Sequence, residues 1–402
     1  MNTSGTTGAR AAGRARVLAL LALAELLGMS VWFSASALAP QLRAEWSLSG
    51  AESGWLTTAV QLGFVAGTAV AALLNLADLV PMRTYFALCA IAAAACNAAL
   101  LAAGGFLPAL ASRFGTGFFL AGVYPPAMKM IATWYRDGRG FAIGTIVGAL
   151  TVGKATPYLV HGLEHAGMAP VVLGASGAGV AAGLLVLAFY HDGPFPFERR
   201  PFAWGLVGAV VRERQVRLAI NGYLGHMWEL YAMWTWIAAF LAAGAGLGAR
   251  AGDVAGFAAI AAGGIGCVAG GWAADRYGRE RLTIQAMALS GACAAIIGLC
   301  IASPTLVVAV AVVWGFAVVA DSAQFSALVT ELAPPHAVGT ALTLQTSLGF
   351  LLTMASIQLV PRLVDLVGWR WAFVALAIGP MLGIAAMRRL RRLRLRSAPA
   401  RT

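Results

Sequence analysis

The chain has 402 residues, of which 60% are hydrophobic and only 11% are charged, and its mean hydropathy is +0.79. This composition excludes a soluble globular protein of this length and indicates an integral membrane protein. The net charge of +12 does not indicate nucleic-acid binding, because the basic residues lie in short segments beside apolar stretches, where they orient the chain and contact anionic lipid.

Apolar stretches recur along the whole chain, each close to the roughly 20 residues that cross a bilayer as a helix. We predict an all-α membrane fold with twelve spans, at 17–38, 55–77, 84–103, 106–131, 138–162, 168–190, 217–243, 254–274, 282–301, 304–330, 337–361 and 371–387. The first stretch is longer than the apolar core of a cleaved signal peptide, so we interpret it as a span. The five cysteines lie in spans without metal-ligand spacing, and we expect them to be packing residues without disulfides.

The basic residues are partitioned between the two sides of these spans. If residue 1 is cytoplasmic, 22 of the 28 Lys and Arg residues fall in cytoplasmic segments and only Arg43, Arg250, Arg362 and Arg370 fall outside. This is the positive-inside pattern. We therefore expect a multi-pass protein of the bacterial inner membrane with both termini in the cytoplasm.

The chain divides into two halves around its longest polar interval. We predict a six-helix bundle over 1–190, a cytoplasmic linker over 191–216 with a short amphipathic helix at 202–214, and a second six-helix bundle with a basic tail over 217–402. Asp78 corresponds to Asp275, and the segment 142–145 corresponds to 337–340, with nearly the same difference in residue number between the two halves. Such repeats in one orientation imply a pseudo-twofold axis along the membrane normal, with a site between the bundles.

Six residues are the clear cases of an ionisable group within a span, where burying a charge is costly and indicates function. They are Glu25, Arg113, Lys154, His226, Glu229 and Asp321. From the helical rise, the two cations share a level nearer the outer side, whereas Glu229 and Asp321 lie nearer the middle. No such residue falls in the third, sixth, ninth or twelfth span.

Each group of ionisable residues has two interpretations. Arg113 and Lys154 either bind an anionic solute or neutralise a buried carboxylate such as Glu25. His226, Glu229 and Asp321 form either a proton relay, to which we add Glu25, or a structural hydrogen-bonded cluster. A metal site made by these three residues is a further alternative, but we expect no metal and no cofactor.

Uncharged residues in spans extend the candidate solute path. Among the aromatic residues of the first and seventh spans we select Trp32 and Tyr231, and among the amides Gln61 and Gln345. Their alternatives are ring packing and hydrogen bonds between helices.

The segment from Gly271 to Arg281 closely resembles the loop motif G-x-x-x-D-R-x-G-R-x-[RK] of the major facilitator superfamily, and Arg113-x-x-x-Gly117 resembles the arginine motif of its fourth span. The first-half copy is degenerate, because it keeps Asp78 but has Leu79 and Pro81 where the motif has Arg and Gly. The resemblance implies that spans 1, 4, 7 and 10 line a central cavity and that spans 3, 6, 9 and 12 face lipid. The gating residues it implies are Gly271, Asp275, Arg276, Gly278, Arg279 and Asp78.

The resemblance implies a monomeric secondary transporter that works by alternating access. From the segregated charges we expect proton-coupled uptake of a small anionic solute. The region around 134–136 is loosely similar to nitrate/nitrite and cyanate porters, although the arginines of the second and eighth spans of the nitrate family are missing. The alternative is proton-driven efflux of drugs or other organic compounds, in whose fifth-span motif Gly precedes Pro, whereas Thr156 precedes Pro157 here.

A membrane-embedded enzyme is the competing class. The sequence has no nucleophile and base pattern and no paired histidine motif for such an enzyme. It also lacks the nucleotide-binding loop G-x-x-x-x-G-K-[ST], which excludes an ATP-driven pump within this chain. We therefore expect a transporter and not an enzyme.

Overall fold

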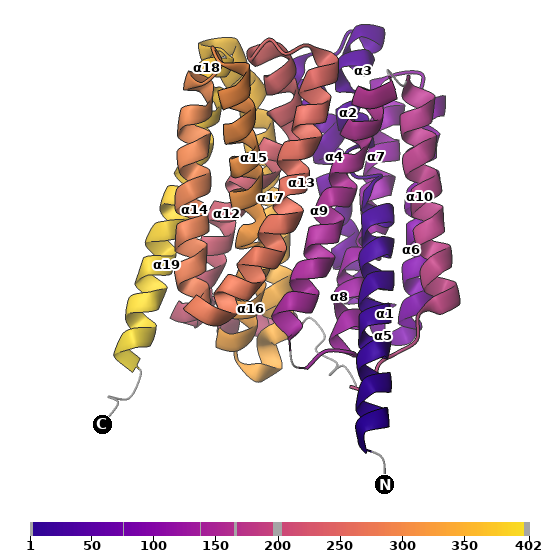
Figure 1. The fold of residues 1–402 in the computed structure, drawn as a ribbon, viewed down its shortest axis with the longest axis vertical. Coiled ribbons are helices and arrows are strands. Elements are labelled where there is room, and N and C mark those ends of the chain that lie inside the picture. Colours follow the sequence, from indigo (N-terminus) through magenta and orange to yellow (C-terminus); the bar gives the residue numbers. More distant parts are fainter. Residues whose placement is uncertain (1–2, 75, 137, 165–166, 196–202, 398–402) are drawn as a thin grey trace.

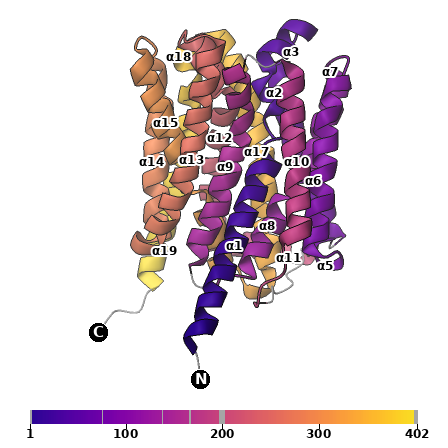
Figure 2. The ribbon, with the colours of Figure 1, turned by 45° about the vertical axis from the view of Figure 1, so that its right-hand side comes forward.

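The computed structural model describes residues 3–74, 76–136, 138–164, 167–195 and 203–397. These residues form long helices that run roughly along one axis, and no strand occurs among them. The first and last long helices, α1 (Thr3–Met29) and α19 (Ile378–Ser397), begin and end the described chain at the same end of the molecule (Figures 1 and 2). We call this the terminal end, and the opposite end the distal end.

The first bundle contains the helices up to residue 189. After α1 these are α2 (Ser34–Ala37), α3 (Ala39–Trp46), α4 (Gly50–Leu73), α5 (Leu76–Leu79), α6 (Met82–Ala98) with η1 (Ala99–Ala102), α7 (Phe106–Leu120), α8 (Tyr124–Ala132), α9 (Arg139–Glu164) and α10 (Met168–Phe189). The predicted amphipathic linker helix is observed as α11 (Trp204–Arg212). Residues 196–202 of the predicted linker lie outside the described residues.

The second bundle repeats this order. Its helices are α12 (Arg214–Ala239) with η2 (Phe240–Gly244), α13 (Ala249–Tyr277), α14 (Arg279–Ile296) with η3 (Ile297–Leu299), α15 (Pro304–Ala320), α16 (Ser322–Leu332), η4 (Pro335–Ala337), α17 (Val338–Val367), α18 (Trp369–Ala372), η5 (Phe373–Ala377) and α19. The predicted architecture of twelve membrane helices in two bundles is confirmed.

Ten helical segments among the described residues are long and apolar enough to cross a membrane. The other two predicted spans correspond to α1 and α12. Arg10, Arg14 and Arg16 occupy the first part of α1, and α12 carries His226 and Glu229 in addition to its basic start. These polar residues lower the mean hydropathy of both helices, although their lengths suit a span.

Three of the spans are broken into two helices. α1 is separated from α2 by residues 30–33, α7 from α8 by residues 121–123 ahead of two prolines, and α15 from α16 by Asp321. A break releases backbone carbonyls from helical hydrogen bonds, so they need other partners inside the membrane. By contrast, Pro157 and Pro361 lie inside the continuous helices α9 and α17.

The two bundles meet along α9 with α13 and along α4 with α17. The contact between α9 and α13 depends on glycine. A Cβ atom at Gly148 would lie 2.7 Å from the carbonyl oxygen of Gly264, and one at Gly144 would lie 3.0 Å from that of Cys267. The helices therefore approach backbone to backbone, as small residues permit in membranes.

Candidate solute cavity

A small cavity of about 70 Å³ lies where helices of the two bundles meet, enough for a few water molecules. The residues that line the cavity are all uncharged except Lys154. They are Met29, Trp32, Phe64, Tyr124, Val147, Leu150, Thr151, Lys154, Tyr223, Met227, Leu230, Tyr231, Trp234, Val319, Ser322, Ser326, Thr346 and Phe350.

The ammonium group of Lys154 is held by aromatic side chains from both bundles. Its Nζ atom donates a hydrogen bond to the Tyr231 hydroxyl at 2.6 Å. It also lies 3.9 Å from the ring centroid of Trp32, 4.8 Å from that of Tyr231 and 5.2 Å from that of Trp234. Contacts between a cation and ring faces stabilise a buried charge without neutralising it. Lys154, Trp32 and Tyr231 are therefore brought together at the cavity.

Two indole groups of the cavity wall have no hydrogen-bond partner. The Nε1 atoms of Trp32 and Trp234 are both buried and neither donates to an acceptor within the described residues. Buried indole N–H groups usually find a partner. Together with Lys154 they give the cavity an excess of donors.

The distal side of the cavity is closed by contacts between the bundles. The Tyr158 hydroxyl donates to the Trp234 carbonyl at 3.3 Å, and nearer the distal end His161 Nδ1 lies 2.6 Å from Asp253 Oδ2. On α4 and α17, the side chains of Thr58 and Gln358 are 3.1 Å apart.

The opposite side of the cavity is less enclosed. Tyr124, Ser322, Ser326 and Thr346 are partly exposed, whereas Trp32 and Trp234 on the distal side are buried. The cavity is therefore approached from the terminal end. Hydroxyl groups line this approach.

Arg113 does not line the cavity, although the sequence paired it with Lys154. Its guanidinium donates to the carbonyl oxygens of Val31 and Trp32, at 2.9 and 2.5 Å, and to Asn97 Oδ1 at 2.6 Å. The two carbonyls lie in the break between α1 and α2. Equal depth in the membrane does not bring two side chains to one face, and Arg113 satisfies freed backbone groups instead.

Glu25 is fully buried on α1, and neither carboxylate oxygen has a hydrogen-bond partner in the described part of the chain. Met29, one turn further along the same helix face, lines the cavity. The charges of Glu25 and Lys154 interact, but the two side chains form no ion pair. Neither cation therefore neutralises Glu25 by direct contact.

The polar cluster of the second bundle lies behind the cavity wall. Glu229 accepts hydrogen bonds from Ser290 Oγ at 2.8 Å and from Trp314 Nε1 at 2.7 Å. His226 Nδ1 lies 2.9 Å from Asp321 Oδ1, although the pair is poorly aligned for a hydrogen bond. Among the described residues, no three His, Cys, Asp or Glu side chains gather as a metal site.

The two selected amides do not line the cavity. Gln61 is buried on α4, and both polar atoms of its side chain lack partners in the described structure. Gln345 donates to Ser326 Oγ at 3.1 Å and so braces a cavity-lining residue.

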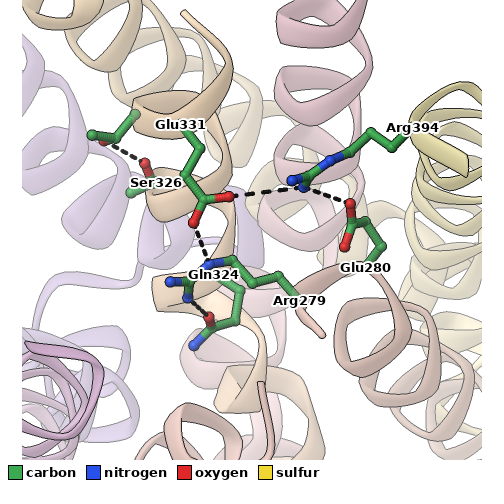
Figure 3. Close-up of polar contacts among 7 residues, drawn as sticks. Arg279, Glu280, Gln324, Ser326, Glu331 and Arg394 are labelled. Atoms are coloured by element: carbon green, nitrogen blue, oxygen red, sulfur yellow. Dashed lines mark hydrogen bonds and ion pairs between the residues drawn. The ribbon is translucent and has the colours of Figure 1, made fainter. Parts of the chain in front are cut away.

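The loop motif lies at the terminal end between α13 and α14, where Gly278 has φ +91° and permits the turn. Arg279 donates to Glu331 at 2.8 Å and to Gln324 at 2.6 Å, and Arg394 pairs with Glu280 at 2.7 Å (Figure 3). These contacts remain within the second bundle. The Arg276 guanidinium lies near the rings of Trp272 and Tyr277.

Asp275 and Gly271 instead reach the first bundle. A Cβ atom at Gly140 would lie 2.8 Å from Asp275 Oδ2, and one at Gly271 would lie 3.2 Å from the Gly140 carbonyl oxygen. Gly140 is in the first turn of α9, where a carboxylate is stabilised by the helix dipole. The first-half counterpart, Asp78, lies in α5, and its side chain is outside the described residues.

Sequence reasoning missed several residues of the cavity, chiefly Trp234, Phe64 and Phe350. Trp234 follows Tyr231 by three positions and thus shares its helix face, a signal that would have identified it. Phe64 and Phe350 carry no comparable local signal, because they meet only when α4 and α17 pack.

A family model described as the Major Facilitator Superfamily matches residues 20–357 and 251–402. Two solved structures of a bacterial homologue of the human lysosomal transporter Spinster, inward-facing and unoccupied or occupied, have TM-scores of 0.72 at 18% and 17% identity, covering 96% of this chain and 99% of theirs. The nucleoside transporter NupG, as a D323A mutant, has a TM-score of 0.70 at 14% identity, covering 93% of this chain and 99% of its own. No curated protein sequence matches the chain.

Proposed function

Because the chain belongs to the major facilitator superfamily and has the fold of its transporters, we propose that it carries a small anionic solute, bound at Lys154, in proton-coupled uptake. The observation that carries this proposal is the lone positive charge on a cavity wall without carboxylates. Among the described residues the only direct hydrogen-bond partner of this buried ammonium group is a phenol, which favours an anion as a counter-charge in direct contact.

The proposed transport cycle is alternating access across the bilayer. On the positive-inside partition, we assign the terminal end to the cytoplasm of a bacterial inner membrane. The cavity, closed at the distal end and approached from the terminal end, then corresponds to an inward-facing state. A reporter fused after Thr402 that is active only outside the cytoplasm would overturn this orientation.

For the coupling proton we favour Glu25 over the cluster of the second bundle. Glu25 is buried without a hydrogen bond and lies one helical turn from the cavity, so leaving it ionised is costly when Lys154 is engaged by a solute. Glu229 already has two donors, and His226 and Asp321 lie beside one another. The sequence analysis proposed these three residues as the proton relay, and they remain the alternative to Glu25 for coupling.

The test is transport of small anions by the purified protein in proteoliposomes, with and without a pH gradient. Lys154→Ala should weaken anion binding at least ten-fold, or about 1.4 kcal/mol or more, which is the scale of losing a charged hydrogen-bond partner. Lys154→Arg should retain part of the binding. The matched control is Lys129→Ala, because Lys129 is the only other lysine and does not line the cavity.

Two outcomes would contradict the proposal. One is a preference for organic cations by the unmodified protein, which would favour drug efflux. The other is full anion binding by a folded Lys154→Ala variant, with the folded state verified by its thermal unfolding temperature.

A further inference from the structure

Three buried donor groups of the cavity lack enough acceptors. Lys154 Nζ uses one of its three protons on Tyr231, and the indole N–H groups of Trp32 and Trp234 make no hydrogen bond among the described residues. An unpaired buried donor is costly. Since no carboxylate lines the cavity, the missing acceptor atoms must come from water or from the solute.

The three donors belong to neighbouring side chains of the cavity wall. The Lys154 ammonium group is close to the rings of both tryptophans, at 3.9 and 5.2 Å from their centroids. A carboxylate has two oxygens with several acceptor positions, so one such group can accept from an ammonium and from indole N–H groups at once. Charge-assisted hydrogen bonds of this kind are stronger than those between neutral groups.

The adjoining wall is apolar and built from rings. The centroids of Phe64 and Phe350 are 4.7 Å apart, and the Trp32 ring lies 5.4 Å from Phe64 and 6.0 Å from Phe350. An inorganic anion such as nitrate would gain little from this surface, because it has no apolar body to bury against the rings. An anion with an apolar body gains both from the donors and from burial against the rings.

Building on the proposed function, we propose that the solute is an organic monocarboxylate with a compact, flat apolar body. Its carboxylate accepts hydrogen bonds from Lys154, Trp32 and Trp234. Its body lies against the aromatic wall formed by Phe64 and Phe350. The cavity, about 70 Å³ in this state, is smaller than such a solute, so the body must be compact and the cavity must widen when the solute binds.

The first experiment measures binding of four probes to the purified full-length protein by calorimetry. Benzoate carries both features, acetate only the carboxylate, nitrate only an inorganic charge, and benzylamine the ring with the opposite charge. We expect benzoate to bind at least ten-fold more tightly than acetate or nitrate, since burial of the ring adds apolar contact. Benzylamine should not bind measurably.

The second experiment separates the indole donors from the indole rings. Trp32→Phe and Trp234→Phe keep an aromatic ring but remove the N–H group, and each should weaken benzoate binding about ten-fold. The matched control is Trp371→Phe, because Trp371 lies exposed on α18 away from the cavity and should leave binding unchanged. Phe64→Leu should weaken benzoate binding but not acetate binding.

The outcomes distinguish this inference from the proposed function. If nitrate binds as tightly as benzoate and still depends on Lys154, the solute class is wrong and the proposed function stands. If benzylamine is preferred, both fail. If both tryptophan variants unfold at the normal temperature and bind benzoate normally, the indole groups are not solute contacts and the inference is overturned.

Discussion

The two bundles treat their buried charges differently. In the second bundle Glu229 accepts two hydrogen bonds from its own bundle, and His226 lies beside Asp321, although His226 Nε2 and Asp321 Oδ1 form no hydrogen bond among the described residues. In the first bundle Glu25 has no partner, and Lys154 reaches across to rings and a hydroxyl that belong partly to the second bundle. Burial alone therefore does not mark a solute site. The informative property is a buried charge that lines the cavity and has no counter-charge in direct contact.

Arg113 gives the largest expected effect in this comparison, because its guanidinium donates four hydrogen bonds within the first bundle. Arg113→Leu removes the side-chain donor of the Trp32 carbonyl and leaves the Val31 carbonyl and Asn97 Oδ1 with the Ser34 hydroxyl as their shared donor. We expect destabilisation by about 3–5 kcal/mol, the scale for breaking a buried charged network. Thermal unfolding in detergent should show a large loss of stability, with Lys154→Leu as the matched cation control showing a smaller one. A stable Arg113→Leu protein that cannot bind anions would instead indicate that Arg113 binds the solute.

The carboxylates provide the next test. Glu25→Gln should reduce uptake driven by a pH gradient at least ten-fold and keep counterflow exchange, because solute binding at Lys154 remains while the titrating group is lost. The Glu229→Gln variant should keep the pH dependence of uptake, because the two hydrogen bonds that Glu229 accepts indicate a structural role. Uptake assays over a range of external pH would measure both. The reverse result would assign coupling to the cluster of the second bundle.

The contact between Asp275 and the start of α9 joins the bundles at the terminal end, and its expected effect is moderate. Asp275→Asn removes a charge stabilised by the helix dipole, so it should slow transport several-fold while leaving equilibrium solute binding within a few-fold. Gly140→Ala should act similarly, because its Cβ atom would press on the Asp275 carboxylate. Loss of solute binding by a folded Asp275→Asn protein would contradict a role in the conformational cycle.

The smallest effect is expected for Arg394, which joins Glu280 and Glu331 near the surface of the second bundle. Its side chain is 38% exposed, and that of Glu331 is 41% exposed. Exposed ion pairs contribute little, so Arg394→Ala should cost less than about 1 kcal/mol, and the cost should shrink with added salt. A loss of stability comparable with that of Arg113→Leu would show that this network, and not the α1 break, carries the fold.

The number of membrane helices could be predicted because hydropathy acts over whole spans, whereas the orientation expected from the arginine placement stays a prediction. The sequence did not predict the breaks at residues 30–33 and at Asp321, since no proline or glycine pair marks either position. The break ahead of Pro125 carried such a signal. The amphipathic linker helix was predicted because its pattern is local, as α11 shows.

The candidate site was only partly predictable. Trp32 and Tyr231 were selected from spans expected to face the cavity, and they do line it together with Lys154. Arg113 and Glu229 were selected because they are ionisable residues inside spans, and they were placed by depth, but depth does not determine the direction in which a side chain points around its helix. The partners of a buried charged group are carbonyl and indole groups from distant segments of the chain, so no local sequence pattern predicts whether the charged group has partners.

The contact of α9 with α13 has a consequence for the rate of transport. At Gly144 and Gly148 the facing surfaces are backbone atoms, so no side chains interlock there. We therefore expect α9 and α13 to move against each other, and one bundle to rotate relative to the other, without the two helices first separating. The activation barrier for the conformational change would then come from the contacts between the bundles at the two ends. These are His161 with Asp253 at the distal end and Asp275 with α9 at the terminal end, so these contacts, and not the centre of the protein, set the turnover rate.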